Sequence, residues 1–157
     1  MQHTILLLSI KPKYAKQIFE YQTKKVELRR VRTRLREGDI VIVYVSSPQK
    51  IFVGSFEVDC VIQEKASVQE IKNFWHLVKD QAGIERKEFY SYYRGASLVV
   101  GIFFRNVQAF SQPVELERLQ KKLSYLRPPQ SYRYLNDKEY EIIKALGEDK
   151  ITLILDQ

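Results

Sequence analysis

The sequence has few of the residues that build covalent or metal-dependent frameworks. It contains one cysteine, Cys60, which excludes a disulfide framework and a cysteine-rich zinc module. Its two histidines, His3 and His76, are far apart in the chain, so we expect no metal site. Six glycines and five prolines are too few for a low-complexity tail.

Long apolar runs are also missing. No segment approaches the roughly 20 apolar residues of a membrane span, and no signal-peptide pattern opens the chain. The apolar fraction of 45% and the charged fraction of 29% are typical of a globular protein. We therefore expect one domain over residues 1–157, with a cytoplasmic location and no membrane partner.

The unusual property of the sequence is its positive charge. It has 26 lysines and arginines against 19 acidic residues, a formal net charge of +7. Residues 1–36 hold ten of the basic side chains and only two acidic ones, Glu20 and Glu27. Five of the ten are arginines between residues 29 and 36, and the planar guanidinium matches phosphate geometry. This segment predicts either a solvated basic surface or a contact surface for a polyanion, most commonly nucleic acid.

The apolar pattern predicts more strands than helices. The expected strands are residues 4–10, 26–29, 40–45, 51–62, 97–110 and 151–155, and the expected helices are 12–21, 67–82, 85–94, 116–126 and 136–147. Alternation in 51–62 places Cys60 on the buried face as a small apolar residue. Alternation of arginines with Val31, Thr33 and Leu35 predicts an extended segment. One α+β domain around a curled sheet or small barrel is the economical arrangement.

No familiar catalytic motif is present. The sequence has no glycine-rich phosphate loop, no G-x-S-x-G and no H-E-x-x-H, and we expect no cofactor. What remains is the set Lys24, Glu27 and Arg29. In a strand Glu27 and Arg29 share a face because their spacing is even, and Lys24 would reach them from the preceding turn. A glutamate between two cations stays ionised, which suits binding better than proton donation, although the set could also be a structural ion-pair cluster.

Two further segments offer binding groups. Residues 128–134, PPQSYRY, combine a stiff backbone with aromatic, guanidinium, amide and hydroxyl groups. Such groups stack on nucleobases and hydrogen-bond their edges, although the tyrosines could instead cover the core. Ser46 and Ser47 follow the strand 40–45, where small hydroxyls could line a pocket.

Three runs of the sequence, taken in order, carry a family resemblance. LLLSIKPKYAKQIF…KKVELRR, VYVSSP…GSFEV and PPQSYRYL together resemble the ASCH domain family, a branch of the PUA-like superfold. The family signature G-x-K-x-x-E-x-R is matched by Lys24, Glu27 and Arg29, with Gln22 where glycine is expected. The resemblance implies a PUA-like small mixed β-barrel with flanking short helices, and a cleft between the barrel and these three residues.

The resemblance also implies a class of ligand. PUA-like domains are associated with RNA binding and with recognition of modified bases. Some ASCH-like proteins are amidohydrolases acting on acetylated cytidine, and others are ribonucleases. The amidohydrolase branch resembles K-x-x-T-x-R, with threonine where this chain has Glu27, so we do not transfer that activity.

The leading hypothesis is a nucleic-acid-binding domain that recognises RNA or a modified nucleobase in a cleft beside a basic edge. RNA is preferred to DNA as the partner, a free nucleotide is an alternative, and no protein partner is indicated. The proposed binding residues are Lys11, Lys24, Glu27, Arg29, Arg30, Arg32, Arg34, Ser46, Ser47, Gln130, Ser131, Tyr132 and Arg133.

Two other functions compete with this hypothesis. One is a metal-independent hydrolase, an amidohydrolase or ribonuclease, with Lys24 as base or electrostatic stabiliser and Glu27 as its partner. The other is a protein-interaction module in which Tyr92, Tyr93 and Tyr132 cover the surface of a partner.

Overall fold

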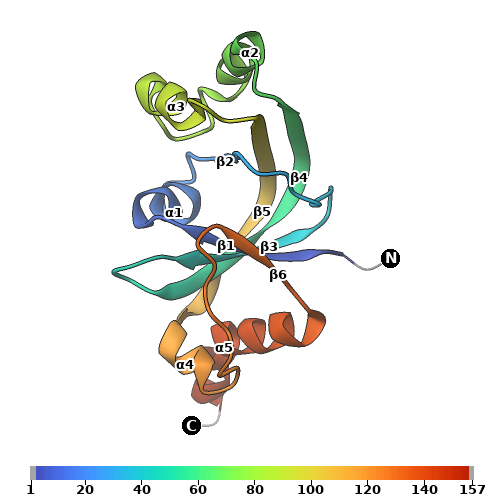
Figure 1. Ribbon diagram of the computed structural model, residues 1–157. Coiled ribbons are helices and arrows are strands. Elements are labelled where there is room, and N and C mark those ends of the chain that lie inside the picture. Colours follow the sequence, from blue (N-terminus) through green and yellow to red (C-terminus); the bar gives the residue numbers. More distant parts are fainter. Residues whose placement is uncertain (1–2, 156–157) are drawn as a thin grey trace.

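A computed structural model describes the backbone of residues 3–155 and the side chains of residues 3–148 (Figure 1). Its strands are β1 (Ile5–Ile10), β2 (Val26–Arg29), β3 (Ile40–Val45), β4 (Ile51–Lys65), β5 (Leu98–Glu115) and β6 (Tyr132–Leu135). Its helices are α1 (Pro12–Phe19), α2 (Val68–Val78), α3 (Arg86–Tyr93), α4 (Leu116–Gln120) and α5 (Asp137–Leu155).

The strands form one mixed sheet in the order β2-β5-β4-β3-β1-β6. The pair β1 and β3 is parallel, with Ile5 opposite Ile40 and Ile10 opposite Val45, and the other pairs are antiparallel. The long strands β4 and β5 run from α2 and α3 at one end of the molecule to α4 and α5 at the other (Figure 1). The α+β class predicted from the sequence is confirmed.

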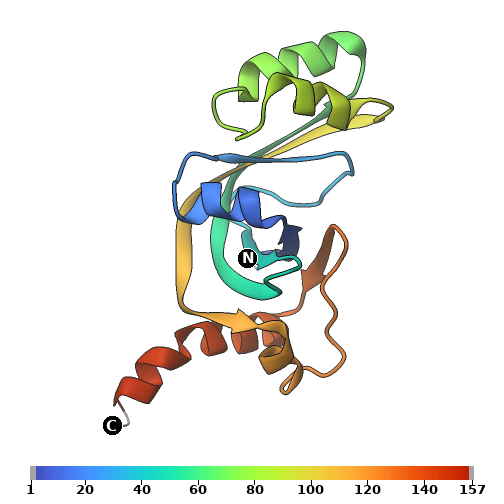
Figure 2. The ribbon, with the colours of Figure 1, turned by 90° about the vertical axis from the view of Figure 1, so that its left-hand side faces the viewer.

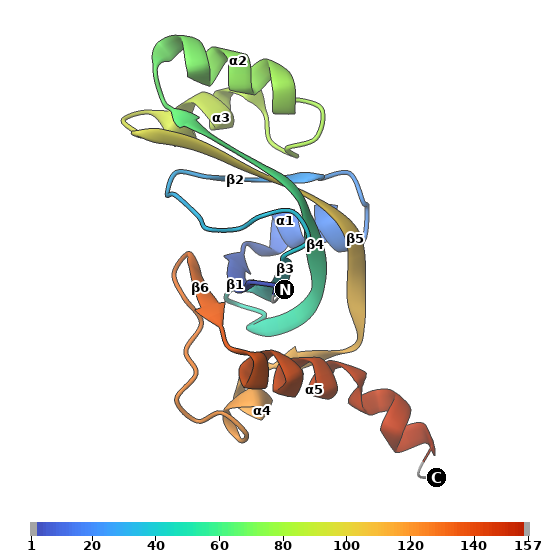
Figure 3. The same ribbon diagram turned by 90° about the vertical axis from the view of Figure 1, so that its right-hand side faces the viewer.

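The sheet curves strongly, with α1 on its concave side (Figures 2 and 3). Its edge strands β2 and β6 share no backbone ladder in the described part of the chain. Side chains connect these edges instead, since Arg29 Nη1 donates to Ser131 Oγ at 3.0 Å and the Arg34 amide donates to the Tyr134 hydroxyl at 2.9 Å. The structure thus has the curled sheet that was one of the two arrangements expected from the sequence, and strand pairing does not close it into a barrel among the described residues; side-chain hydrogen bonds join its open edges.

The core lies on both faces of the sheet and under the two helical ends. Strands β1 and β3 are apolar at almost every position because both of their faces are covered. Buried residues inside the curl include Leu6, Leu8, Val41, Val43, Phe56 and Phe104. Leu7, Ile42 and Phe52 of the sheet pack in one cluster with Leu119 of α4 and Ile143 of α5. Val26 of β2 packs in another with Phe74 of α2 and with Phe89 and Tyr93 of α3.

Three helices begin with the proline or the capping residues that the sequence predicted. Pro12 is the first residue of α1, a position where its missing N–H costs no hydrogen bond. The Ser67 Oγ accepts the Glu70 amide at 3.1 Å and caps α2. At α5, the Asn136 and Glu139 side chains each accept the other's backbone N–H, at 2.8 and 2.9 Å.

Several sequence predictions about local structure are wrong. The helix predicted over residues 116–126 ends at Gln120. Cys60 is exposed, because the β4–β5 register shifts between Val58 and Cys60 and such a bulge reverses the alternation of faces. Residues 151–155 belong to helix α5 and form no strand, since α5 continues through Gly147. A Cβ at Gly147 would lie 2.6 Å from Phe110 Cγ, so this glycine makes room for an aromatic ring and does not end the helix.

The arginine-rich segment after β2 is a loop. The predicted alternation holds for buried Thr33 and Leu35 and for exposed Arg32 and Arg34, but Val31 is 57% exposed, and the segment pairs with no strand of the described chain. Strand β6 was not expected from the sequence. The result is an exposed row of arginines held beside the gap between β2 and β6.

Candidate functional site

The predicted set Lys24, Glu27 and Arg29 comes together at the edge strand β2. Lys24 lies in the turn before the strand, where Gln22 adopts a left-handed φ of 56° in place of the glycine of the family signature. The Lys24 side chain is buried, and its Nζ lies 3.5 Å from Glu27 Oε1 and donates to the Ala82 backbone oxygen at 2.6 Å. The predicted reach of Lys24 around the turn is confirmed.

Arg29 connects this cluster to the opposite side of the sheet. It lies on the same face of β2 as Glu27, and its Nε donates to Glu27 Oε2 at 3.2 Å. Its terminal nitrogens also donate to the Ser9 backbone oxygen and to Ser131 Oγ, both at 3.0 Å. One guanidinium therefore joins β2, β1 and the loop before β6.

Burial and charge determine the ionisation of the cluster. Burial lowers the pKa of Lys24, and Glu27 opposes this effect only in part. Burial alone would raise the pKa of Glu27, but the adjacent Arg29 and Lys24 outweigh it and hold that pKa below its usual value. Glu27 is therefore a carboxylate whose two oxygens are both engaged by cations, as the sequence predicted, and it is a poor proton donor.

A cleft of about 760 Å³ opens over these residues. Six of the predicted binding residues line it: Lys11, Lys24, Glu27, Arg29, Ser46 and Gln130. The cleft lies where the start of α1, the end of β3, helix α3 and the loop before β6 meet. Segments that are far apart in the chain thus build one concavity.

Two tyrosines that line the cleft from helices α1 and α3 were not assigned to the site from the sequence. The Tyr14 ring centroid lies 5.1 Å from Lys24 Nζ, and its hydroxyl donates to Glu88 at 3.0 Å. Burial and Glu88 raise the pKa of Tyr14 to about 12, so it stays a neutral aromatic. Tyr92 lines the cleft from α3 and donates to the Leu28 backbone oxygen at 3.3 Å. The helical spacing of these tyrosines was the only signal, and it is equally typical of core residues.

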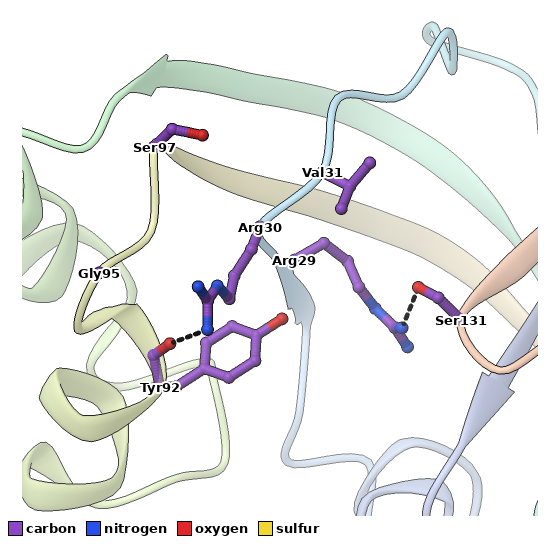
Figure 4. A pocket seen from close by; sticks show the side chains of 7 residues that line it. All are labelled: Arg29, Arg30, Val31, Tyr92, Gly95, Ser97 and Ser131. Carbon is purple, nitrogen blue, oxygen red and sulfur yellow. Dashed lines mark hydrogen bonds between the residues drawn. The ribbon is translucent and has the colours of Figure 1, made fainter.

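A second, smaller pocket of about 400 Å³ adjoins the cleft (Figure 4). Its lining consists of Arg29, Arg30, Val31, Tyr92, Gly95, Ser97 and Ser131. Arg29 and Tyr92 line both cavities, so they form a shared wall. Two more of the predicted binding residues, Arg30 and Ser131, belong to this pocket.

The remaining predicted residues lie outside both cavities. Ser47 is exposed beyond β3. Arg32 and Arg34 are exposed on the loop after β2, where the Arg34 guanidinium lies 4.1 Å from the Tyr134 ring centroid. Tyr132 and Arg133 point elsewhere: the Tyr132 hydroxyl donates to the Arg32 backbone oxygen at 2.6 Å, and Arg133 pairs with Glu139 at 3.1 Å.

The surface suggested for a protein partner is not formed as predicted. Tyr93 is 1% exposed, and its hydroxyl donates to the Arg29 backbone oxygen at 3.0 Å. It therefore supports β2 from the core and is not available to a partner. Tyr92 is 37% exposed and belongs to the wall between the two cavities.

Neither a clustered metal-ligand set nor a membrane-spanning helix occurs in the described chain. No group of three or more histidine, cysteine or acidic residues could hold a metal ion within the described residues. None of the described helices is both long and apolar enough to cross a bilayer.

Comparison with known proteins places the chain in a family. Residues 5–124 match DUF365, a domain of unknown function. The large ribosomal subunit protein uL22 of Ureaplasma parvum is 25% identical over 130 residues, which are 83% of this chain and 39% of that protein. The chain thus spans well under half the length of the curated relatives it matches.

Three solved structures show the same fold. ASCH from Zymomonas mobilis superposes with a TM-score of 0.80 at 22% identity, over 90% of this chain and 94% of that chain. The N-terminal domain of Staphylothermus marinus McrB gives a TM-score of 0.57 at 11% identity, over 92% and 98% of the two chains. Human THYN1, in complex with DNA containing 5-methylcytosine, gives 0.55 at 14% identity, over 92% and 98%. The chain belongs to the DUF365 family, and its fold is that of ASCH and other PUA-like domains.

Proposed function

We propose that this protein binds nucleic acid, with one base or nucleotide in the cleft and the strand backbone along the exposed arginines beside it. The observation that carries the proposal is the position of the cleft next to the loop of residues 30–36. A volume of about 760 Å³ lies within the usual range of pockets for small ligands, roughly 300–1,000 Å³.

The lining of the cleft suits a nucleobase attached to phosphate. Four basic side chains line it, Lys11, Lys24, Arg29 and Lys87, against two acidic ones, Glu27 and Glu88. Three tyrosines, Tyr14, Tyr44 and Tyr92, supply aromatic faces of the kind on which bases stack. Gln130 and Ser46 add groups that can hydrogen-bond a base edge.

The loop arginines have their charges available. Among side chains of residues 3–148, no carboxylate forms an ion pair with Arg30, Arg32 or Arg34, whereas Arg105 and Arg133 are paired. Unpaired guanidiniums on one exposed edge can contact phosphates and release the counterions bound there. We call Arg30, Arg32 and Arg34 the basic edge.

The comparisons support the proposal through the fold. A structure of the same fold, human THYN1, is in complex with DNA containing 5-methylcytosine. The curated relatives are proteins of the large ribosomal subunit, of which this chain matches 39% of the length, so they leave RNA and DNA both as candidate partners. RNA and DNA of the same sequence must therefore be compared directly.

The test is the salt dependence of binding to single-stranded RNA and DNA of about 12 nucleotides, a length within the usual site size. Fluorescence anisotropy is measured between about 50 and 200 mM salt. Replacing Arg32 and Arg34 by glutamine should reduce the slope of log K against log salt by about 1.4, since each phosphate contact on a single strand contributes about 0.7. The matched control, Lys121→Gln with Lys122→Gln, removes two exposed charges from the segment after α4 and should leave the slope unchanged. An unchanged slope in the arginine variant overturns the electrostatic part of the proposal.

The hydrolase alternative has one observation in its favour. The pKa of buried Lys24 is lowered, so its neutral amine is more accessible than that of an exposed lysine. Against it, Lys24 Nζ is already engaged by Ala82 and Glu27. Incubating the protein with RNA and with acetylated cytidine in the presence of chelator tests this alternative: product formation that disappears in a Lys24→Met variant shown to be folded supports hydrolysis, and no product from either substrate counts against it.

A further inference from the structure

We propose that the smaller pocket is a binding site for one phosphate of the nucleotide whose base occupies the cleft. The ligand is accordingly a phosphorylated nucleotide or a strand segment, and a free base or nucleoside lacks part of what the site recognises. This inference rests on the proposed function and assigns the specific contacts within it.

The lining of the smaller pocket is cationic without opposing acid. Of its seven lining residues two are arginines, two are serines and none is acidic. Arg29 shares its charge with Glu27, but Arg30 has no carboxylate partner among the described side chains. Among the described residues the Arg30 guanidinium makes one hydrogen bond, from Nη1 to the Tyr92 backbone oxygen at 3.1 Å, and its other N–H groups remain for an anion.

The geometry separates the two guanidiniums around the pocket. Arg29 and Arg30 are adjacent in sequence, and their side chains leave the end of β2 in different directions (Figure 4). Arg29 points toward Ser131 and Arg30 toward Tyr92, each held by a hydrogen bond (Figure 4). The two guanidiniums therefore point away from each other, and because both arginines line the pocket, they supply positive charge to an anion at two separate parts of its wall.

The opposite side of the pocket is open and carries an unused hydroxyl. Gly95 follows α3 with a φ of +77°, and a Cβ built there would meet no atom within 4 Å. The Ser97 hydroxyl makes no hydrogen bond to another described residue, although it lines the pocket. The backbone at Gly95 thus leaves space for a ligand next to the Ser97 hydroxyl, which is available as a hydrogen-bond donor.

The two adjoining cavities differ in which part of a nucleotide they suit. The cleft offers aromatic faces for a base, and its four basic side chains share the space with the carboxylates Glu27 and Glu88. The smaller pocket has no carboxylate. Because Arg29 and Tyr92 line both, a base in the cleft would place its sugar at their shared wall and a neighbouring phosphate in the smaller pocket.

The test compares each of the four ribonucleosides with its 3′- and 5′-monophosphates by NMR titration of the full chain. The wild type should bind at least one monophosphate about tenfold more tightly than its nucleoside, since charge-assisted hydrogen bonds to an anion are strong. Arg30→Gln should bring this ratio close to one and leave the affinity for the nucleoside unchanged. The matched control Arg94→Gln removes an exposed arginine that lines neither cavity and should keep the tenfold ratio.

A second arm distinguishes a strand from a free nucleotide. Trinucleotides carry an uncharged methylphosphonate in place of the phosphate on one or the other side of the central base. If a strand phosphate occupies the pocket, one of the two replacements should weaken binding about tenfold and the loss should vanish in Arg30→Gln. If only the mononucleotide shows the preference, the occupant is a terminal phosphate, which still supports the site.

Two results overturn the inference. Equal wild-type affinity for nucleosides and monophosphates contradicts a phosphate site but leaves the proposed function standing, because nucleosides still bind. An Arg30→Gln variant that weakens nucleoside and nucleotide equally shows a structural role for Arg30 alone. If neither nucleosides nor oligonucleotides bind the wild type, both this inference and the proposed function are wrong.

Discussion

The ammonium nitrogen of Lys24 lies 2.6 Å from the backbone oxygen of Ala82, a residue 58 positions later in the chain. Ala82 belongs to the connection between α2 and α3, whereas Lys24 precedes β2. The bond therefore fixes the helical pair that carries Tyr92 against the edge strand that carries Glu27. Together with the hydrogen bond from the Tyr93 hydroxyl to the Arg29 backbone oxygen, the Lys24 bond holds the floor of the cleft against one of its walls.

Lys24→Met should consequently destabilise the protein. It leaves the Ala82 oxygen without its donor and removes one of the two cations that engage buried Glu27. Breaking a buried ion pair of this kind typically costs about 3–5 kcal/mol. Urea unfolding measures the loss, and Lys25→Met, at an exposed neighbouring position, should change stability by no more than about 0.5 kcal/mol. Equal losses of stability in Lys24→Met and Lys25→Met would contradict a stabilising role for the buried Lys24 side chain.

The stabilisation from Glu27 should depend on pH in a defined direction. Its pKa is lowered in the folded protein from an ordinary value of 4.5. A carboxyl of this kind contributes stability above its unfolded pKa and loses that contribution as the pH falls through the folded value. The difference in unfolding free energy between wild type and Glu27→Gln should thus be constant from pH 7 to about 5 and shrink in more acidic solution. A difference that grows on acidification would mean that the carboxylate is not held by its cations.

Gln22 offers a test of the turn that positions Lys24. A non-glycine residue at a φ of 56° carries a backbone penalty of roughly 1–2 kcal/mol, part of which glycine regains. Gln22→Gly should stabilise the protein by about 0.5–1 kcal/mol in thermal or urea unfolding. The same change at Thr23, whose φ is not positive, should instead destabilise it by about 0.5–1 kcal/mol. Destabilisation at both positions would argue against the left-handed turn.

Much of the fold could be predicted from local patterns. Continuous apolar runs identified β1 and β3, and capping residues identified the starts of α1, α2 and α5. Cys60 was misplaced because a register shift within a long strand leaves no mark in an alternating sequence. The strand expected at residues 151–155 was wrong because an apolar run of that length fits helix as well as strand.

The candidate site was predictable where its residues are close in the chain. Even spacing placed Glu27 and Arg29 on one face, and their ion pair confirms it. Tyr14 and Tyr92 were missed as site residues because they come from separate helices, whose approach to β2 depends on tertiary packing. The same reason explains the smaller pocket, which exists only because the residues that follow α3 lie next to the end of β2.

The central claim, that the cleft receives a base of a nucleic acid, is tested most directly by filling the cleft. Ser46 lines it, while the next residue, Ser47, is exposed outside it. Fluorescence anisotropy with single-stranded RNA and DNA of about 12 nucleotides compares Ser46→Trp with Ser47→Trp. Ser46→Trp should weaken binding at least about tenfold, because stacking and hydrogen bonding of the base are lost, and Ser47→Trp should bind like the wild type. Equal affinity of the two variants for these oligonucleotides would contradict the binding of a base in the cleft.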